Sequence, residues 1–318
     1  MLTRRRRRRR WTSTTTTAPT VQYLDLTGLS ILERLVLEEY VYQTQTQCNW
    51  VLIGTHGLQS TLEESSPWSL ASSFLHSSRD AAIVLGIGGK IPELLYTKPV
   101  QDDQIPVIRR FSGGGTVLMN GDCIWTTLMG RDFPTRPFYP RPLMEYTATH
   151  FFHPLFTRLQ SYQQLKQQQS NDHHSSTTIT TDNLFSLREH DYVWDKDSKI
   201  AGNAQSIGKT GWLHHTSFLW QIPSGMSRYL RLPAKRPEYR ASRPHEDFVR
   251  ALSQIFPHLT VDDFRRAFRE TSQTVYSVES SCVLSELQEE YLLPVVVPEG
   301  GLRQWYQTKS RTKVMTQF

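Results

Sequence analysis

Two short segments of the chain combine bare backbone with cationic side chains, a combination suited to holding an anionic, activated acyl group. The first runs Arg109-Arg110-Phe111-Ser112-Gly113-Gly114-Gly115-Thr116-Val117, and the second runs Lys199-Ile200-Ala201-Gly202-Asn203-Ala204-Gln205. Three consecutive glycines leave backbone N–H groups open to another molecule, and the arginines add positive charge for a phosphate or carboxylate. On its own, a glycine triplet is more often a hairpin turn or a linker.

The segments that flank the glycines favour a binding loop. Ile105-Pro106-Val107-Ile108 precedes them and Thr116-Val117-Leu118-Met119 follows, and both have the composition of short β-strands. A tight loop between two rigid strands can present its backbone in a fixed geometry. We therefore expect the loop, Arg110 included, to serve a ligand rather than the core.

Such a loop suits the activation of a carboxylic acid. Making an amide from a free acid proceeds through a mixed anhydride with AMP, whose developing phosphate charge must meet preorganised N–H groups and cations. The glycine loop can supply the N–H groups, and Arg109, Arg110 and Lys199 can supply the cations. Gly202 lacks a Cβ, so the backbone there can lie against a flat acyl or purine group. The alternative for Lys199 is an ordinary exposed lysine in the turn at 195–199.

A histidine pair follows on another predicted strand. His214 and His215 are adjacent, so on a strand their side chains point to opposite faces and one of them should be structural. A Ser-His or Cys-His nucleophile system remains open, although no cysteine stands in a recognisable acyl-thioester motif.

The order of these motifs resembles the lipoate-protein ligase A and lipoyltransferase family, part of the biotin/lipoate A/B protein ligase superfamily. Further similarity lies in Leu37-Glu38-Glu39-Tyr40, Ala82-Ile83-Val84-Leu85-Gly86 and Trp212-Leu213-His214-His215-Thr216-Ser217-Phe218-Leu219. The resemblance covers roughly residues 21–250. It implies an α+β fold, a mixed β-sheet flanked by helices, similar to class II aminoacyl-tRNA synthetases. Tyr239-Arg240, Arg243-Pro244-His245 and Asp247-Phe248 are closest to a plant and algal lipoyltransferase-like branch.

The resemblance also implies a reaction and its participants. Lipoate or octanoate would be transferred to a protein lysine through an acyl-adenylate, with ATP and Mg²⁺ as cofactors. The acceptors would be lipoyl-domain proteins, with acyl carrier protein as an alternative acyl donor. Lys199 would be the catalytic residue, orienting the acyl carbonyl and the adenylate bridge oxygen without acting as the nucleophile. The implied acyl- and nucleotide-binding residues are Arg109, Arg110, Ser112, Gly113, Gly114, Gly115, Thr116, Val117, Leu118, Asp191, Gly202, Ala204 and His215.

The chain departs from the family pattern just after the glycine loop. Many ligases of the family read Gly-Gly-Gly-(Ala/Thr)-Val-(Phe/Tyr)-His-Asp and then Gly-Asn. Here Met119 replaces the histidine, Asn120 the aspartate and Asp122 the asparagine. That asparagine lies near phosphate and magnesium in the family, so ATP-dependent activation is in doubt and Asp122 becomes the candidate metal ligand.

Two other functions therefore remain open. One is an ATP-independent octanoyl- or lipoyltransferase, and the other is a non-catalytic acyl- or nucleotide-binding or regulatory protein on the same scaffold. The Gly-Arg-Gly-Arg phosphate loop of biotin ligases is absent from the sequence, which argues against biotin as the substrate.

Composition indicates a soluble protein with one sizeable core. The chain has 318 residues, 38% hydrophobic, and no apolar run near the roughly 20 residues that span a bilayer. Its three cysteines are widely separated, which argues against a disulfide scaffold and favours a reducing compartment. We expect a monomer with no membrane partner.

The net charge of +6 depends on an arginine run at 4–10, without which the chain is close to neutral. Residues 1–20 contain no acidic residue and are rich in Ser and Thr, as in transit peptides, which predicts a mitochondrial or plastid location. The alternative is a solvated basic tail on a cytoplasmic protein, with only nonspecific contact to nucleic acid.

The sequence predicts three regions: this tail at 1–20, a catalytic domain at 21–258 and a short helical extension at 259–318. Residues 163–183 are rich in Gln, Ser, Thr, Asn and His and are expected to form a disordered insertion. Helical spacing of apolar residues predicts a helix over 142–165 and helical structure from 245 onward. Short β-type runs are predicted at 185–187, 192–194, 199–200 and 216–221.

Overall fold

The computed structural model describes residues 18–57, 66, 68–70, 81–134, 136–169, 184–283 and 298–315. Almost all of the predicted N-terminal tail and residues 170–183 of the predicted insertion lie outside these ranges. Within them, no helix has the length and apolar character that crossing a membrane requires.

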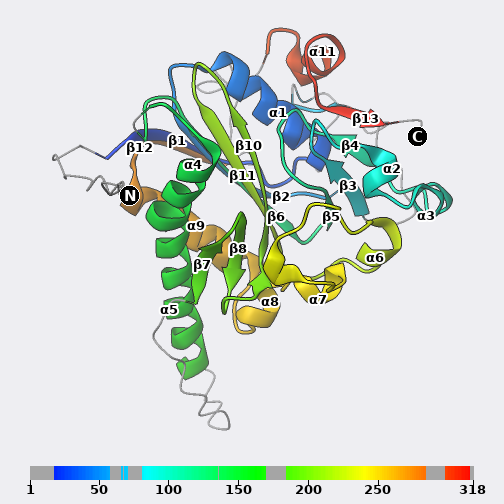
Figure 1. Cartoon of the computed structure of the whole chain (residues 1–318). Coiled ribbons are helices and arrows are strands. Elements are labelled where there is room, and N and C mark those ends of the chain that lie inside the picture. Colours follow the sequence, from blue (N-terminus) through cyan, green and yellow to red (C-terminus); the bar gives the residue numbers. More distant parts are fainter. Residues whose placement is uncertain are drawn as a thin grey trace, which may run out of the picture.

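The centre of the fold is a six-stranded mixed sheet (Figure 1). The three neighbouring pairs at one end, from β10 to β2, are antiparallel, whereas β2–β1 and β1–β12 are parallel. In spatial order its strands are β10 (Ala201–Ile207), β11 (Trp212–Leu219), β6 (Cys123–Gly130), β2 (Trp50–Thr55), β1 (Thr20–Asp25) and β12 (Ser277–Val283). This mixed sheet confirms the predicted fold class.

Two smaller sheets carry the predicted functional segments. One has four strands in the order β13 (Lys313–Met315), β4 (Val107–Arg109), β3 (Ala81–Leu85) and β5 (Val117–Asn120). The other has β7 (Phe185–Arg188), β8 (Asp191–Trp194) and β9 (Ser198–Lys199). The glycine loop joins β4 to β5, so the prediction of a loop between two strands is confirmed.

Apolar side chains of the central strands point alternately to the two faces of the large sheet, and a separate hydrophobic core lies on each face. On β11, Leu213 belongs to the core shared with the four-stranded sheet, whereas Trp212 and Phe218 belong to the core on the opposite face. Successive strand residues point to opposite faces, which explains this division.

Helix α1 (Ile31–Thr44) lies in the first core and is buried along Ile31–Val41. Ser30 caps its N-terminus, accepting from the backbone N–H of Glu33, whose side chain accepts from the N–H of Ser30 in return. This reciprocal cap satisfies backbone donors that would otherwise be left without partners. Several charged side chains of this helix are buried, and two of them, Arg34 and Glu38, extend to the functional site.

The opposite face is covered by one long helical segment and by α9 (Val261–Val275), visible beside the large sheet in Figure 1. The long segment comprises α4 (Pro140–Thr147), a π-helical stretch at Ala148–Phe152 and α5 (His153–Gln169). Residues 163–169 were predicted to be disordered but form the last turns of α5. Gln163 is buried and accepts from the N–H of His258, and Lys166 pairs with Asp263 at 2.5 Å, so contacts distant in sequence order this end.

The C-terminal region also differs from the predicted helical extension. Residues 259–318 contain α9 and α11 (Gly301–Thr308), but they also supply β12 to the large sheet and β13 to the four-stranded sheet. The segment from residue 245 onward was predicted to be helical, but before α9 it contains only two single-turn helices, α7 (His245–Phe248) and α8 (Leu252–Ile255). Between these turns Val249 forms a β-bridge with Lys199, a pairing that local periodicity does not reveal. Three further short helices are α2 (Ile91–Leu94), α3 (Thr97–Asp102) and α6 (Met226–Tyr229).

Candidate functional site

The glycine loop is held in shape by its own arginine. Arg110 is buried, and its Nη2 donates to the carbonyls of Gly113 at 3.2 Å and Gly115 at 2.8 Å. Burial lowers the pKa of this guanidinium to about 10. Arg110 therefore fixes the shape of the loop as well as lying beside the ligand space, and the expectation that it serves only a ligand is wrong.

Gly114 is the position at which the loop requires glycine. Its φ is +115°, and a Cβ there would lie 2.8 Å from Nη2 of Arg110 and from the carbonyl oxygen of Asn203. The N–H of Gly113 donates to the carbonyl of Gln205 at 3.0 Å, which ties the loop to β10. The two motifs identified in the sequence thus pack directly on each other.

A cavity of about 60 Å³ opens between the glycine loop and the strands β9, β10, β11 and β6. This volume exceeds the roughly 10–15 Å³ that one water molecule needs on the same measure, so the carboxyl end of an acid can enter. Its lining residues are Arg110, Gly115, Thr116, Val117, Trp125, Lys199, Gly202, Asn203, Ala204, His215 and Ser217. Eight of the residues predicted from the sequence are therefore brought together.

Three polar atoms on the cavity residues have no hydrogen-bond partner within the described structure although each is shielded. They are Nε of Arg110, Oγ1 of Thr116 and Nδ2 of Asn203. A buried polar group without a partner costs roughly 1–3 kcal/mol, and such groups call for an explanation. All three can donate a hydrogen bond, so together they would suit the oxygen atoms of a carboxylate, an acyl carbonyl or a phosphate.

Lys199 reaches the same cavity from β9. Its Nζ forms an ion pair with Asp191 at 2.6 Å, and Asp191 also accepts from the hydroxyl of Tyr239 at 2.8 Å. The backbone carbonyl of Lys199 accepts from the N–H of Arg250. Asp191 does not line the cavity; it holds the amino group that does.

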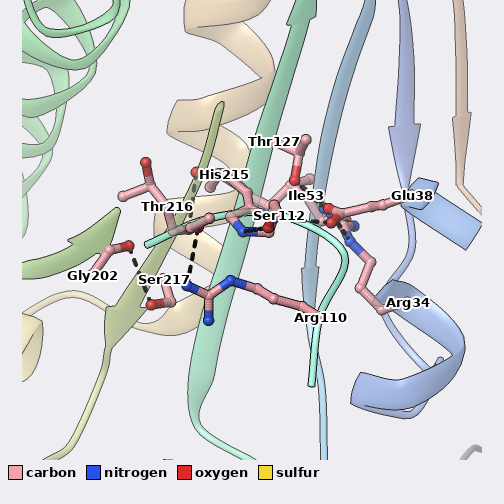
Figure 2. Close-up of polar contacts among 12 residues, drawn as sticks. Arg34, Glu38, Ile53, Arg110, Ser112, Thr127, Gly202, His215, Thr216 and Ser217 are labelled. Atoms are coloured by element: carbon pink, nitrogen blue, oxygen red, sulfur yellow. Dashed lines mark hydrogen bonds and ion pairs between the residues drawn. The ribbon is translucent and has the colours of Figure 1, made fainter. Parts of the chain in front are cut away.

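Ser112 and His215 belong to a buried network behind the loop (Figure 2). The Ser112 Oγ lies 3.0 Å from Nε2 of His215, whose Nδ1 lies 3.2 Å from Oε2 of Glu38. The other carboxylate oxygen of Glu38 accepts from Arg34 at 2.7 Å and from the Thr127 hydroxyl. All five side chains are buried, and Figure 2 shows them in one connected group.

The ionisation of this network follows from its burial and its partners. Burial favours the neutral form of Glu38, but Arg34 and His215 outweigh it and lower the pKa of the carboxyl to about 2. Burial lowers the pKa of His215, although Glu38 opposes that shift. Near neutral pH the network therefore contains a carboxylate and an uncharged imidazole.

The two histidines point to opposite faces of the sheet, as their adjacent positions on one strand predict. His214 faces the opposite core, where its Nε2 lies 3.0 Å from the Tyr192 hydroxyl and its Nδ1 accepts from the side-chain amide of Gln205 at 3.1 Å. Burial lowers its pKa to about 3. His214 is the structural member of the pair, and His215 is the member at the site.

Several predicted site residues do not line the cavity. Arg109 donates through Nη1 to the carbonyls of Ile87 at 3.1 Å and Gly89 at 2.6 Å, so it braces a neighbouring loop. Leu118 is a core residue of β5, and Asp122 is exposed at the turn between β5 and β6. Within the described residues no three His, Cys, Asp or Glu side chains are grouped closely enough to hold a metal ion. The Asp122 metal site stays a prediction.

Sequence reasoning missed five residues of the site. Trp125, Asn203 and Ser217 line the cavity, and Glu38 and Arg34 anchor His215. Asn203, Ser217 and Glu38 lie inside the motifs that carry the family resemblance, but nothing in those motifs singles out these side chains. Trp125 lies on β6, whose β-branched and aromatic run at 123–129 was a usable strand signal.

Comparisons with known proteins identify the family of the chain. Residues 58–273 match the model of the lipoyl protein ligase A/B catalytic domain, so the chain belongs to that family. It is 26% identical over 245 residues to a Plasmodium falciparum protein named inactive lipoate–protein ligase 2. The match covers 72% of this chain and 62% of that relative's length.

Solved structures show the same fold. A bipartite lipoate protein ligase with its E2 lipoyl domain from Thermoplasma acidophilum gives a TM-score of 0.59 at 14% identity, covering 92% of this chain and 93% of that one. A lipoate-protein ligase A bound with ATP gives a TM-score of 0.56 at 14% identity, and the match covers 92% of this chain and 96% of that one. The predicted family and fold are confirmed, and the plant and algal branch stays a prediction.

Proposed function

We propose that the protein attaches lipoate or octanoate to a lysine of a lipoyl-domain acceptor, with the acyl group activated as an adenylate. The main support for this proposal is that Lys199, the glycine loop and three unpaired buried donors meet at one cavity. Related proteins of this fold include one named as bound with ATP and one named together with its E2 lipoyl domain. Both support ATP and a lipoyl domain as candidates here.

The cavity residues suit an acyl-adenylate, because their donors would face the oxygen atoms on which negative charge develops during the reaction. Arg110 Nε, Thr116 Oγ1 and Asn203 Nδ2 would meet the carbonyl and phosphate oxygens, and Lys199 would lie beside the bond to be broken. Donors that are already fixed need no reorganisation when the negative charge appears. Gly202 matters because a Cβ there would approach Ser217 Oγ to 2.9 Å.

A non-catalytic binding protein is the second candidate. One relative is named inactive, and Met119, Asn120 and Asp122 stand where many ligases have His, Asp and Asn. On this alternative the cavity would bind an acyl or nucleotide ligand without turnover.

One experiment separates these functions. Purified protein is incubated with lipoate, ATP and Mg²⁺, and pyrophosphate release and lipoylation of a lipoyl domain are measured; a second arm replaces ATP and lipoate with octanoyl acyl carrier protein. Transfer in the first arm supports the ligase, and transfer only in the second supports the ATP-independent transferase. Calorimetric binding of lipoate without transfer in either arm would overturn the enzyme proposal in favour of the binding protein.

A further inference from the structure

Ser112, His215 and Glu38 form a line of hydrogen bonds that joins three distant parts of the chain. Ser112 lies in the glycine loop, His215 on β11 and Glu38 on α1, and the two links measure 3.0 Å and 3.2 Å (Figure 2). A hydroxyl bonded to an imidazole whose other nitrogen meets a carboxylate is the arrangement that activates a serine for nucleophilic attack.

The protons in this line can be assigned from the acid–base state of each group. An ionised carboxylate only accepts hydrogen bonds, so Nδ1 of His215 carries the proton donated to Glu38. The imidazole is neutral, which leaves Nε2 as an acceptor for the Ser112 hydroxyl. The serine O–H therefore points at a base whose tautomer is fixed.

The orientation of the imidazole is fixed from several sides. Oε1 of Glu38 is occupied by Arg34 and Thr127, so Oε2 remains for His215. The Trp125 ring meets the His215 ring edge-on at 5.5 Å between centroids. Burying an Arg–Glu pair carries a desolvation cost and does not by itself indicate added stability. A role in holding His215 accounts for the placement of this pair.

The line ends at the wall of the cavity. His215 and Arg110 line the cavity, and Ser112 lies directly behind them with 1% of its surface exposed. The hydroxyl is thus shielded from water and joined to the cavity by its hydrogen bond to His215, so a thioester has to reach it through the cavity, past His215. An ester formed at this position would be protected from hydrolysis.

We infer that Ser112 is an acyl-accepting nucleophile, and that the protein carries its acyl group as a Ser112 ester before passing it to the acceptor amine. This inference rests on the proposed acyl-transfer function and adds to it a covalent intermediate. It gives the ATP-independent route a nucleophile, with an acyl thioester as the class of donor.

The chemistry balances without any further reactant. Ser112 Oγ attacks the thioester carbonyl carbon, its proton passes to Nε2 of His215, the C–S bond breaks, and the departing thiolate takes that proton. The acceptor amine then attacks the ester carbonyl and gives a proton to His215, which returns it to Ser112 Oγ as the C–O bond breaks. The products are an amide and a free thiol, and nothing is oxidised or reduced. Arg110 Nε and Asn203 Nδ2, two unpaired donors on cavity residues, would stabilise the oxyanion formed in each step.

The cysteines whose side chains are described do not compete for this role. Neither Cys48 nor Cys123 lines the cavity. Burial raises the pKa of the Cys123 thiol to about 12, which keeps it in the unreactive thiol form.

The test uses S-octanoyl-pantetheine as the donor and intact-mass and peptide mass spectrometry as the first readout. We expect one octanoyl group on Ser112 in the wild-type protein and none on Ser112 in Ser112→Ala. Glu38→Gln should acylate at least about a hundredfold more slowly, because removing an orienting carboxylate costs on the order of 10²- to 10⁴-fold. Ser206→Ala on β10 is the matched control and should acylate like wild type.

Chemical stability identifies the bond. The wild-type adduct should survive neutral hydroxylamine as an ester does, whereas Ser112→Cys should give a thioester that hydroxylamine removes. Melting curves report whether each variant is folded, and Ser112→Ala, which removes a single oxygen, keeps the test valid if Glu38→Gln unfolds.

Two readouts separate this inference from the proposed function, namely the ester on Ser112 and the amide on a lipoyl domain, each measured with the thioester donor and again with lipoate, ATP and Mg²⁺. An ester without an amide supports the inference and overturns the transfer function. Wild-type amide formation by Ser112→Ala, or an octanoyl group mapped to another residue, overturns the inference and leaves the function standing. The absence of both products overturns both.

Discussion

At the scale of single residues, the cations around the cavity are held by the protein rather than left free. Arg110 is braced by the carbonyls of its own loop, and Lys199 is paired with Asp191 at 2.6 Å. Such charges are fixed before a ligand arrives, so little of the binding free energy is spent on ordering them. The unpaired donors beside them are where a ligand gains new hydrogen bonds.

Lys199→Ala should lower acyl transfer to a lipoyl domain at least about a hundredfold, the usual size of losing one preorganised charge-stabilising donor. Lys199→Arg should be nearly as poor, because a planar guanidinium cannot replace a compact ammonium between two oxygens and Asp191. Stability should fall as well, because the Lys199 side chain is only 25% exposed and its loss leaves the largely buried Asp191 carboxylate without its cation; transfer is therefore compared at equal amounts of folded protein. Lys196→Ala, in the preceding turn, is the control. Wild-type transfer by Lys199→Ala would remove the catalytic assignment.

The adjacent glycines Gly114 and Gly115 provide a second, matched comparison. Gly114→Ala combines a left-handed φ with a Cβ only 2.8 Å from Arg110 Nη2, so it should lower the free energy of unfolding by roughly 1–3 kcal/mol or more. A Cβ at Gly115 meets no atom within 4 Å, so Gly115→Ala should stay within about 0.5 kcal/mol of wild type. Urea unfolding measures both. Equal stability of the two variants would show that the loop tolerates side chains throughout.

At the scale of elements, the C-terminal strand is tied to the first helix by one buried carboxylate. Glu39 on α1 accepts from the Ser310 hydroxyl at 2.7 Å and from the backbone N–H groups of Arg311 at 2.8 Å and Thr312 at 3.0 Å. The next residues form β13, which pairs with β4, and β4 leads into the glycine loop. The C-terminal segment is therefore linked to the glycine loop through β4.

Glu39→Gln should lower the free energy of unfolding by about 1–3 kcal/mol. The amide cannot accept all three hydrogen bonds, and its N–H₂ group would face the donors. Hydrogen exchange should quicken at the amides of Lys313–Met315. Arg311→Ala is the control, since only the backbone N–H of this exposed residue takes part. Unchanged exchange in β13 of Glu39→Gln would mean that strand pairing alone holds the C-terminus.

The sequence predicted local elements and motif positions better than it predicted their partners. The strands around the glycine loop and the helix covering 142–165 follow from patterns a few residues long. The pairing of β12 with β1, and the contact of Glu38 with a histidine 177 residues later, depend on the whole fold. For the same reason residues 163–169 were predicted to be disordered by composition, although Lys166 and Gln163 have partners in and just before α9.

At the scale of the whole molecule, acid sensitivity follows from histidines that the fold buries uncharged. His56 is buried with Nδ1 2.9 Å from the carbonyl of Leu29, and its Nε2 has no partner among the described residues. Burial lowers the pKa of His56 to about 3, and that of His214 likewise to about 3, from 6.5. The unfolded chain therefore binds protons below pH 6.5 that the folded protein does not take up until near pH 3.

The free energy of unfolding should consequently fall as the pH drops below 6.5. Each buried histidine contributes up to 1.36 kcal/mol per pH unit, so His56 and His214 together should remove about 4 kcal/mol between about pH 7 and about pH 5. Glu38, whose pKa is lowered from 4.5 to about 2, loses its contribution only below this window. Urea unfolding at the two pH values measures the difference, and His214→Gln should reduce it by about half of the two-histidine contribution. The exposed His190→Gln is the control, and a pH dependence that His214→Gln leaves unchanged would show that His214 is protonated in the folded protein.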